Sequence, residues 1–100
     1  MKKLFICIIN YTQPLEIIEK HLKSHRDYLK EWYAKDILLA SGPKCPKDGG
    51  IIIGKFNNIC EAILFSKNDP YTIHNLATYN IIEFDPILHS SILNEFLNDK

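Results

Sequence analysis

Residues 3–14 of this chain read KLFICIINYTQP, an apolar stretch that leads into a turn and a helix start. Both alternating faces of residues 3–11 are apolar, which is typical of a strand that is covered on both sides. Pro14 suits the first turn of a helix, because the amide hydrogen that proline lacks would have no partner there. The stretch therefore predicts a first strand over about residues 3–11, followed directly by a helix.

After Pro14, apolar side chains recur at alternating spacings of three and four, which predicts an amphipathic helix to about Lys35. Ser24, a residue type that caps helices, marks a candidate break within it. The apolar stripe consists of Leu15, Ile18, Leu22, His25, Leu29 and Trp32. One position of the stripe is thus a histidine, whose ring should point inward rather than into bulk water.

The rest of the chain continues to alternate strand and helix signals. Apolar, β-branched runs predict strands over residues 37–41 and 51–53, paired as a hairpin, and a longer strand over about residues 76–84. An asparagine cap predicts a short helix from residue 57 or 58 to 65, and the last amphipathic stretch predicts an extra C-terminal helix over residues 86–98. The order β-α-β-β-α-β is the ferredoxin-like arrangement, an α+β fold with a four-stranded antiparallel sheet.

The length of 100 residues suits a single domain over residues 1–100, with a core over residues 1–86 and the extra helix over residues 86–98. Both main helices of such a fold pack on one face of the sheet, although three of the strands are apolar on both faces. The second face therefore needs a cover. A second copy of the same sheet is the simplest cover, which predicts a homodimer through the sheet faces. The C-terminal helix is the rival cover.

Charge and composition narrow the class of protein. Twelve basic residues balance twelve acidic ones, so the chain has no electrostatic reason to bind nucleic acid or an anionic membrane. No apolar run approaches the ~20 residues that span a bilayer, and the run near the start is too short for a signal peptide. Three cysteines, an odd number without CxxC spacing, are typical of a reduced protein. We therefore expect a cytoplasmic protein.

His25 and Asp69 are the candidate catalytic residues. A buried imidazole needs hydrogen-bond partners, and the simplest interpretation of His25 is a core histidine bonded to a backbone carbonyl. Asp69 stands in Asn-Asp-Pro-Tyr, residues 68–71, where a carboxylate commonly caps the turn itself. If the two side chains meet, the carboxylate fixes the imidazole tautomer and leaves the other ring nitrogen as a general base or acid. The sequence leaves both interpretations open.

Ser41, Gly42 and Pro43 end the second predicted strand. Such a segment is usually only a turn, but it also places a hydroxyl and a backbone amide at the rim of any pocket between sheet and helix. Tyr71 and Tyr79 are candidate pocket walls, although aromatic residues at these spacings also serve as core.

Metal and cofactor sites find little support in the sequence. His21 and His25 are four residues apart, which places two imidazoles on one helical face, but Leu22 stands where the HExxH pattern has glutamate. Cys45 lies in a loop near two lysines, which favours a thiolate, yet an incidental surface thiol is the simpler interpretation. Motifs for nucleotide phosphates and serine hydrolases are absent. We expect neither a metal nor a cofactor.

In this order, the segments resemble the YCII-related (YciI-like) family over about residues 1–86. The matching segments are His25-Arg26, Tyr28-Leu29, ILLASGP at 37–43, GGIII at 49–53, Asp69-Pro70-Tyr71 and YNIIEF at 79–84. The resemblance implies a dimeric α/β-barrel of two ferredoxin-like units, with a His–Asp active site on His25 and Asp69 and a pocket lined by Ser41, Gly42 and Pro43. One family-like member is a dehydrochlorinase acting on a chlorinated hydroxyhydroquinone, and muconolactone isomerases share the broader fold.

The leading hypothesis is a cofactor-independent enzyme acting on a small organic molecule. His25 would shuttle a proton, Asp69 would orient it, and Ser41, Gly42, Pro43 and Tyr71 would contact the substrate. Elimination and isomerisation both require a proton to move next to an activated carbon, which suits these residues. The competing hypotheses are a non-catalytic small-molecule-binding or accessory module that uses the same cleft, and a dimerisation element for a partner protein.

Overall fold

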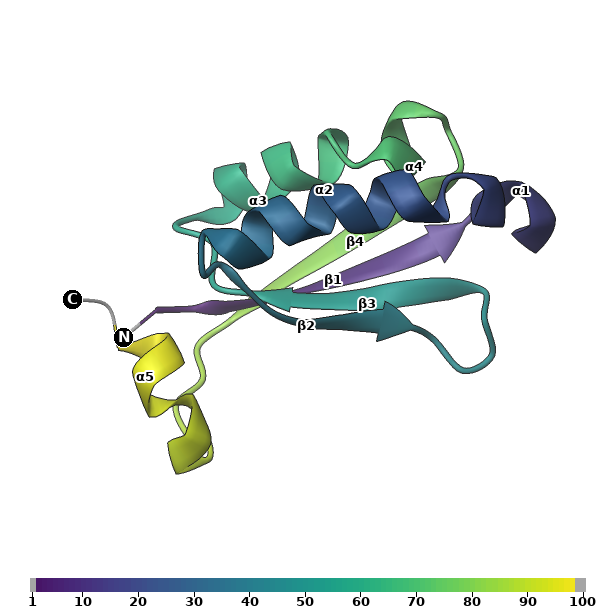
Figure 1. The fold of residues 1–100 in the computed structure, drawn as a ribbon. Coiled ribbons are helices and arrows are strands. Elements are labelled where there is room, and N and C mark those ends of the chain that lie inside the picture. The colour runs from purple at the N-terminus through teal and green to yellow at the C-terminus, as the bar shows by residue number, and fades with distance from the viewer. Residues whose placement is uncertain (1, 99–100) are drawn as a thin grey trace.

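A computed structural model describes residues 2–98, in which a four-stranded antiparallel sheet carries helices on one face (Figure 1). Strand β1 (Leu4–Tyr11) lies inside the sheet, between β3 (Gly49–Gly54) and β4 (Ala77–Phe84), and β2 (Leu38–Pro43) pairs with β3 at the edge. The sheet order β2-β3-β1-β4 is that of a ferredoxin-like unit. The predicted α+β class and the predicted element order are confirmed.

The predicted first helix is divided into α1 (Leu15–Lys20) and α2 (Leu22–Ala34). The break lies at His21, whose φ of −109° and ψ of 5° leave the helical region, and not at Ser24. Ser24 instead lies within α2, where its hydroxyl donates to the carbonyl of His21. The stripe nevertheless continues across the break, so His25 and Leu29 are both buried.

Two further helices follow the hairpin. Helix α3 (Ile59–Lys67) begins after Asn58, whose side chain accepts the Glu61 amide, as the sequence predicted. Helix α4 (Pro70–Ile73) stands where the sequence predicted only a turn. Asp69 caps α4, and Pro70 occupies the first helical position, where its missing amide hydrogen costs nothing. Neither these nor any other helix within residues 2–98 is long and apolar enough to cross a membrane.

The main core lies between the sheet and these helices and is built around Phe65. Its ring meets those of Tyr28, Trp32, Phe56 and Tyr79 at centroid distances of 5.0 to 6.2 Å. Edge and offset ring contacts at such distances add to the free energy of burial. This aromatic cluster fixes α2 and α3 over the sheet, and with them the position of His25.

The loop of the β2–β3 hairpin is held close to the end of β1. The Tyr11 amide donates to the carbonyl of Asp48 at 3.0 Å. A Cβ atom at Gly49 would lie 1.8 Å from the Ile9 carbonyl oxygen, so this position requires glycine. The hairpin loop is thereby positioned beside α1 and the start of α2.

The C-terminal helix predicted over residues 86–98 is wrong in its bounds. Residues 85–90 form no helix, and a 3-10 turn η1 (Ser91–Leu93) leads into a short α5 (Asn94–Leu97). Ile87 and Leu88 are 71% and 92% exposed, so the predicted apolar stripe has nothing to pack against. A short helix without a packed face is marginal in water. Ser90 then caps the turn that follows, by accepting the Ile92 amide.

Helix α5 lies on the opposite side of the sheet from the other helices (Figure 1). It is attached at one end of the sheet, because Leu97 is buried and the Lys55 amine donates to the carbonyl of Phe96. Ile82 and Phe84, on the same sheet face, remain 45% and 40% exposed. The C-terminal segment therefore does not cover that face, and the predicted homodimer stays a prediction.

Candidate functional site

The structure brings His25 and Asp69 into contact. Nδ1 of His25, on α2, lies 2.9 Å from Oδ1 of Asp69 at the start of α4. Asp69 is fully buried and His25 is 8% exposed. Two residues 44 positions apart thus form a buried His–carboxylate pair, and the alternative partner for His25, a backbone carbonyl, is not the one that its Nδ1 meets.

The carboxylate of Asp69 accepts hydrogen bonds from three sides. Besides His25, the backbone amide of Tyr71 donates to Oδ1 at 2.9 Å, and the Tyr79 hydroxyl donates to Oδ2. Burial first, and then the neighbouring charge of Asp69, raise the pKa of Tyr79 far above its ordinary value, so this phenol remains a donor. A buried carboxylate with this many donors is satisfied without solvent.

These contacts determine which nitrogen of His25 carries the proton. A carboxylate can only accept hydrogen bonds, so the Nδ1–H of His25 donates to Asp69. In the neutral ring, Nε2 is then unprotonated and available to accept a proton from a substrate. Tyr71 keeps the ring in place from the side, because the two rings are stacked with centroids 4.0 Å apart and planes 5° apart.

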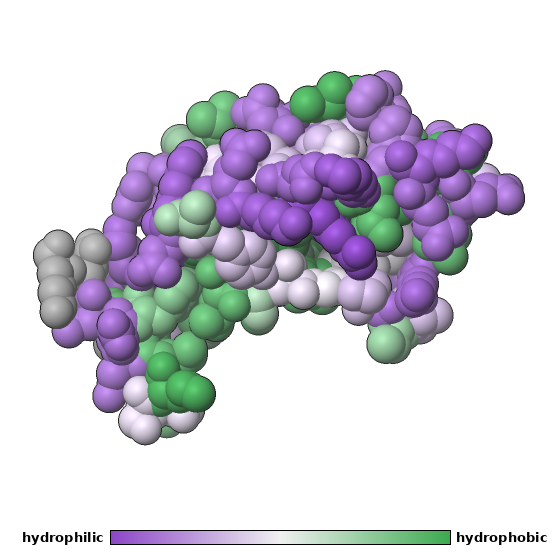
Figure 2. Space-filling model, viewed as in Figure 1, coloured by the Kyte–Doolittle hydropathy of each residue, from purple (hydrophilic) through white to green (hydrophobic). Residues whose placement is uncertain are grey.

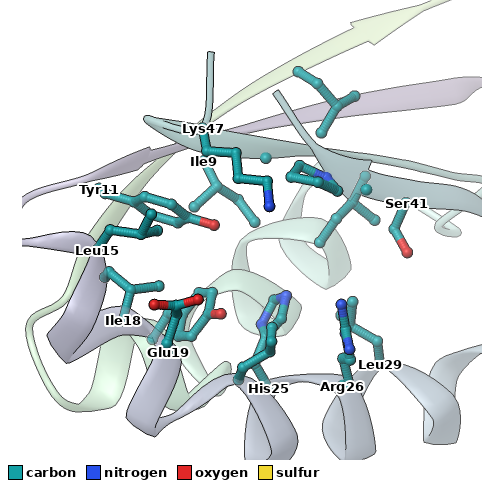
Figure 3. A pocket seen from close by; sticks show the side chains of 17 residues that line it. Ile9, Tyr11, Leu15, Ile18, Glu19, His25, Arg26, Leu29, Ser41 and Lys47 are labelled. Carbon is teal, nitrogen blue, oxygen red and sulfur yellow. The ribbon is translucent and has the colours of Figure 1, made fainter. Parts of the chain in front are cut away.

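His25 opens onto a cavity of about 230 Å³ between α1, α2 and the β2–β3 hairpin (Figure 3). Ser41, Gly42, Pro43 and Tyr71, all predicted from the sequence, line the same cavity. The structure therefore brings five of the six predicted site residues together at one cavity, while Asp69 lies behind His25. The Ser41 hydroxyl is hydrogen-bonded to the Tyr33 hydroxyl at 2.7 Å, so it presents an oxygen whose orientation is already fixed.

Of the two roles that the sequence left open for Tyr79, pocket wall and core, the structure supports the core. Tyr79 does not line the cavity, and its hydroxyl lies on the far side of Asp69. The strand alternation of β4 directs Tyr79 to the helix-covered face, where Asp69 happens to start α4. Its place is behind the His–Asp pair, as a third member of a hydrogen-bonded chain.

Four other polar residues of the cavity were missed in the sequence: Tyr11, Glu19, Arg26 and Lys47. Arg26 and Glu19 sit on positions that the helical pattern assigns to solvent, and Lys47 lies in a loop. These positions become the walls of a cavity only because the β2–β3 hairpin lies opposite α1 and α2 across it. The sequence held one indication of these residues: Arg26 directly follows the candidate catalytic residue His25.

No three histidine, cysteine, aspartate or glutamate side chains of residues 2–98 gather in a way that would hold a metal. His21 lies against His74, with ring centroids 4.5 Å apart, instead of facing the cavity with His25. Cys45 is exposed in the hairpin loop and is not among the residues that line the cavity.

Comparison with solved structures finds the same fold in an enzyme. The chain is similar to 5-chloro-2-hydroxyhydroquinone dehydrochlorinase from Burkholderia phenoliruptrix, solved in complex with 2,5-dihydroxybenzoquinone. The TM-score is 0.72 at 20% identity, over 82% of this chain and 93% of the other. No curated protein gives a significant match. The sequence profile of the YCII-related domain matches residues 4–85, which is most of the chain, and this protein therefore belongs to the YCII-related family.

Proposed function

We propose that this protein is a cofactor-independent enzyme that moves a proton on a small organic molecule. His25 is the general base and acid, and Asp69 orients it. The observation that carries this proposal is a His–carboxylate pair whose outer nitrogen faces a cavity. A histidine with a purely structural role would need neither the cavity nor the stacked tyrosine. Both of its ring nitrogens would form hydrogen bonds with other groups of the protein.

The cavity has the size for a single substituted ring. A cavity of about 150 Å³ is known to take up benzene, so about 230 Å³ accommodates a six-membered ring with a few oxygen substituents. Apolar walls from Ile9, Leu15 and Ile18 contact such a ring, while Ser41 offers a polar contact at the rim.

Elimination is the reaction that these residues support best. His25 Nε2 removes a proton from a carbon that a neighbouring carbonyl activates, and the C–H electron pair forms a new double bond. The bond to a leaving group on the adjacent carbon breaks, and chloride departs with its electron pair. The fold shared with a dehydrochlorinase supports this choice. In the isomerisation variant of the reaction, His25 instead returns the proton to another carbon of the same molecule.

We also propose that the protein is a homodimer through the bare face of its sheet. Partly or fully exposed apolar side chains lie on this face in register: Ile53, Ile6 and Ile82 in one row and Ile51 and Ile8 in the next, with Phe84 further along β4. Figure 2 shows hydrophobic residues gathered on the underside, next to the C-terminal segment. An apolar sheet face of this extent is rare on a monomer, and a self-complementary interface buries it.

The experiment is a chloride-release assay with 5-chloro-2-hydroxyhydroquinone and related halogenated ring compounds. We expect release by the wild type and loss of at least a hundredfold in His25→Ala, the usual scale for a general base. His21→Ala is the matched control, because His21 lies nearby but outside the cavity. Equal losses in the two variants would contradict the assigned role of His25. Ligand binding by the wild type without any turnover would favour the non-catalytic binding module.

A further inference from the structure

Two cationic side chains border the His25 cavity from opposite walls. Arg26 extends from α2 beside His25, and Lys47 reaches down from the hairpin loop with its amine directed into the cavity (Figure 3). Within residues 2–98, neither makes an ion pair. Neighbouring lysines do: Lys44 pairs with Asp48 at 3.2 Å, and Lys23 pairs with Asp27 at 2.7 Å. Within the part of the chain that the structure describes, the two cations at the mouth of the cavity are thus left without an acidic partner.

A second observation in the same cavity also indicates a missing partner. Tyr71 is 1% exposed and lines the cavity, and within residues 2–98 its hydroxyl lies near that of Tyr11 but makes no hydrogen bond of good geometry. A buried hydroxyl without a partner costs free energy, which a ligand oxygen would recover by accepting its proton. Burial raises the pKa of Tyr71, so its hydroxyl remains a donor at neutral pH. Arg26 lines the same cavity as this hydroxyl.

We infer that the cavity selects a small organic anion: a single ring that carries a carboxylate or an ionised enol or phenol oxygen. Arg26 and Lys47 hold the charged oxygen at the mouth, and the Tyr71 hydroxyl donates to an oxygen deeper inside. This inference rests on the proposed function only in taking the His25 cavity as the ligand site. It adds the charge of the ligand and the residues that recognise it.

Glu19 determines how much negative charge the site accepts. Its carboxylate lines the cavity from the α1 side (Figure 3), so the three charged lining residues sum to one positive charge. A ligand with one negative charge completes this balance, whereas a second negative charge would meet the Glu19 carboxylate. Removing the charge of Glu19 should therefore strengthen anion binding, the opposite of what removal of Arg26 or Lys47 does.

The test compares benzoate with benzamide, which have nearly the same shape and differ in charge. Binding of each to the full-length protein is measured by NMR titration at low and at high salt. We expect benzoate to bind more tightly than benzamide, with an advantage that shrinks as salt screens the charges. Arg26→Gln and Lys47→Gln should each weaken benzoate binding about threefold to fivefold, the scale of solvent-exposed ion pairs, and change benzamide binding less than about twofold.

Two further variants complete the design. Glu19→Gln should tighten benzoate binding, and Lys30→Gln, which removes an exposed α2 lysine outside the cavity, should leave it unchanged. Equal affinity for the two probes, no binding of either, or the same loss in Lys30→Gln as in Arg26→Gln would overturn the inference. Because these are binding measurements, they stand apart from the proposed reaction. Charge-dependent binding without any turnover would leave the anion site in place and refute only the reaction.

Discussion

Replacing Asp69 with asparagine separates the role of its charge from its role as a helix cap. Asparagine has the same shape, so its oxygen can still accept the Tyr71 amide and His25 Nδ1, both of which meet Oδ1 of Asp69. The second oxygen, however, becomes an amide nitrogen, which can only donate, so the Tyr79 hydroxyl loses its acceptor and can keep a bond only by accepting from that nitrogen. The substitution preserves the cap and removes the acceptor for Tyr79.

The magnitude follows from these three hydrogen bonds. A hydrogen bond to a charged group contributes about 1.5–3 kcal/mol and a neutral one about 0.5–1.5 kcal/mol, so two bonds become neutral ones and the third survives only with its direction reversed. Part of this loss is offset, because a buried carboxylate costs more to desolvate than an amide. We therefore expect Asp69→Asn to lower the free energy of unfolding by about 1–3 kcal/mol, within the usual 5–15 kcal/mol stability of a domain.

The assay is urea unfolding followed by circular dichroism, with Tyr79→Phe and the double variant measured in parallel. Tyr79→Phe removes the same hydrogen bond from the other side, so the double variant should lose clearly less than the sum of the two single losses. Additive losses, or an Asp69→Asn variant as stable as the wild type with unchanged turnover, would refute the reasoning. Asp69 would then be only the cap of α4.

Three other predictions concern the core, the dimer and alkaline pH. Phe65→Ala should lower the free energy of unfolding by about 3–5 kcal/mol, because four aromatic rings lose their common neighbour, and an unchanged urea midpoint would contradict this. Ile6→Lys places a charge in the middle of the proposed interface, so it should convert the dimer into a monomer in light scattering. The circular dichroism spectrum should stay unchanged. A wild type that is monomeric at micromolar concentration would contradict the dimer. Burial raises the pKa of Cys7 from 9.0 to about 12, so the folded thiol stays protonated while the unfolded one ionises. The stability from Cys7 is therefore complete below pH 9 and lost as pH rises toward 12, by about 1.4 kcal/mol at pH 10. Cys7→Ala should reduce the fall in unfolding free energy between pH 8 and 10, and an equal fall in both proteins would contradict this assignment.

The order of the strands and helices could be predicted because hydrophobic periodicity records which faces are buried. His25 was recognised as inward-facing for the same reason, since it occupies a leucine position of the α2 stripe. Asp69 was singled out from its turn sequence, but only the family resemblance implied that it pairs with His25, because no local pattern connects residues 44 positions apart. The cap of α3 by Asn58 was predictable because capping depends on only four neighbouring residues.

The missed features all depend on tertiary contacts. The C-terminal stretch has a helical apolar pattern, but Ile87 and Leu88 meet no surface of this chain, so the helix begins only after Ser90. Arg26 and Lys47 became cavity walls because the hairpin lies opposite α2 across the cavity, which the sequence of either segment alone does not record. Charged residues at exposed positions are ordinary, and only their shared cavity makes them candidates for a site.

The most direct test of the proposed His–Asp pair is the protonation state of each ring nitrogen of His25 in the neutral imidazole, measured by ¹⁵N NMR of the wild type and of Asp69→Ala, which leaves Nδ1 without its acceptor. The account predicts a single tautomer in the wild type, with Nδ1 protonated and Nε2 free, a mixture of tautomers in Asp69→Ala, and a response of Nε2 when a ligand enters the cavity. A wild-type ring protonated on Nε2, or one tautomer unchanged by the substitution, would contradict the claim that Asp69 orients His25 as the base of the site.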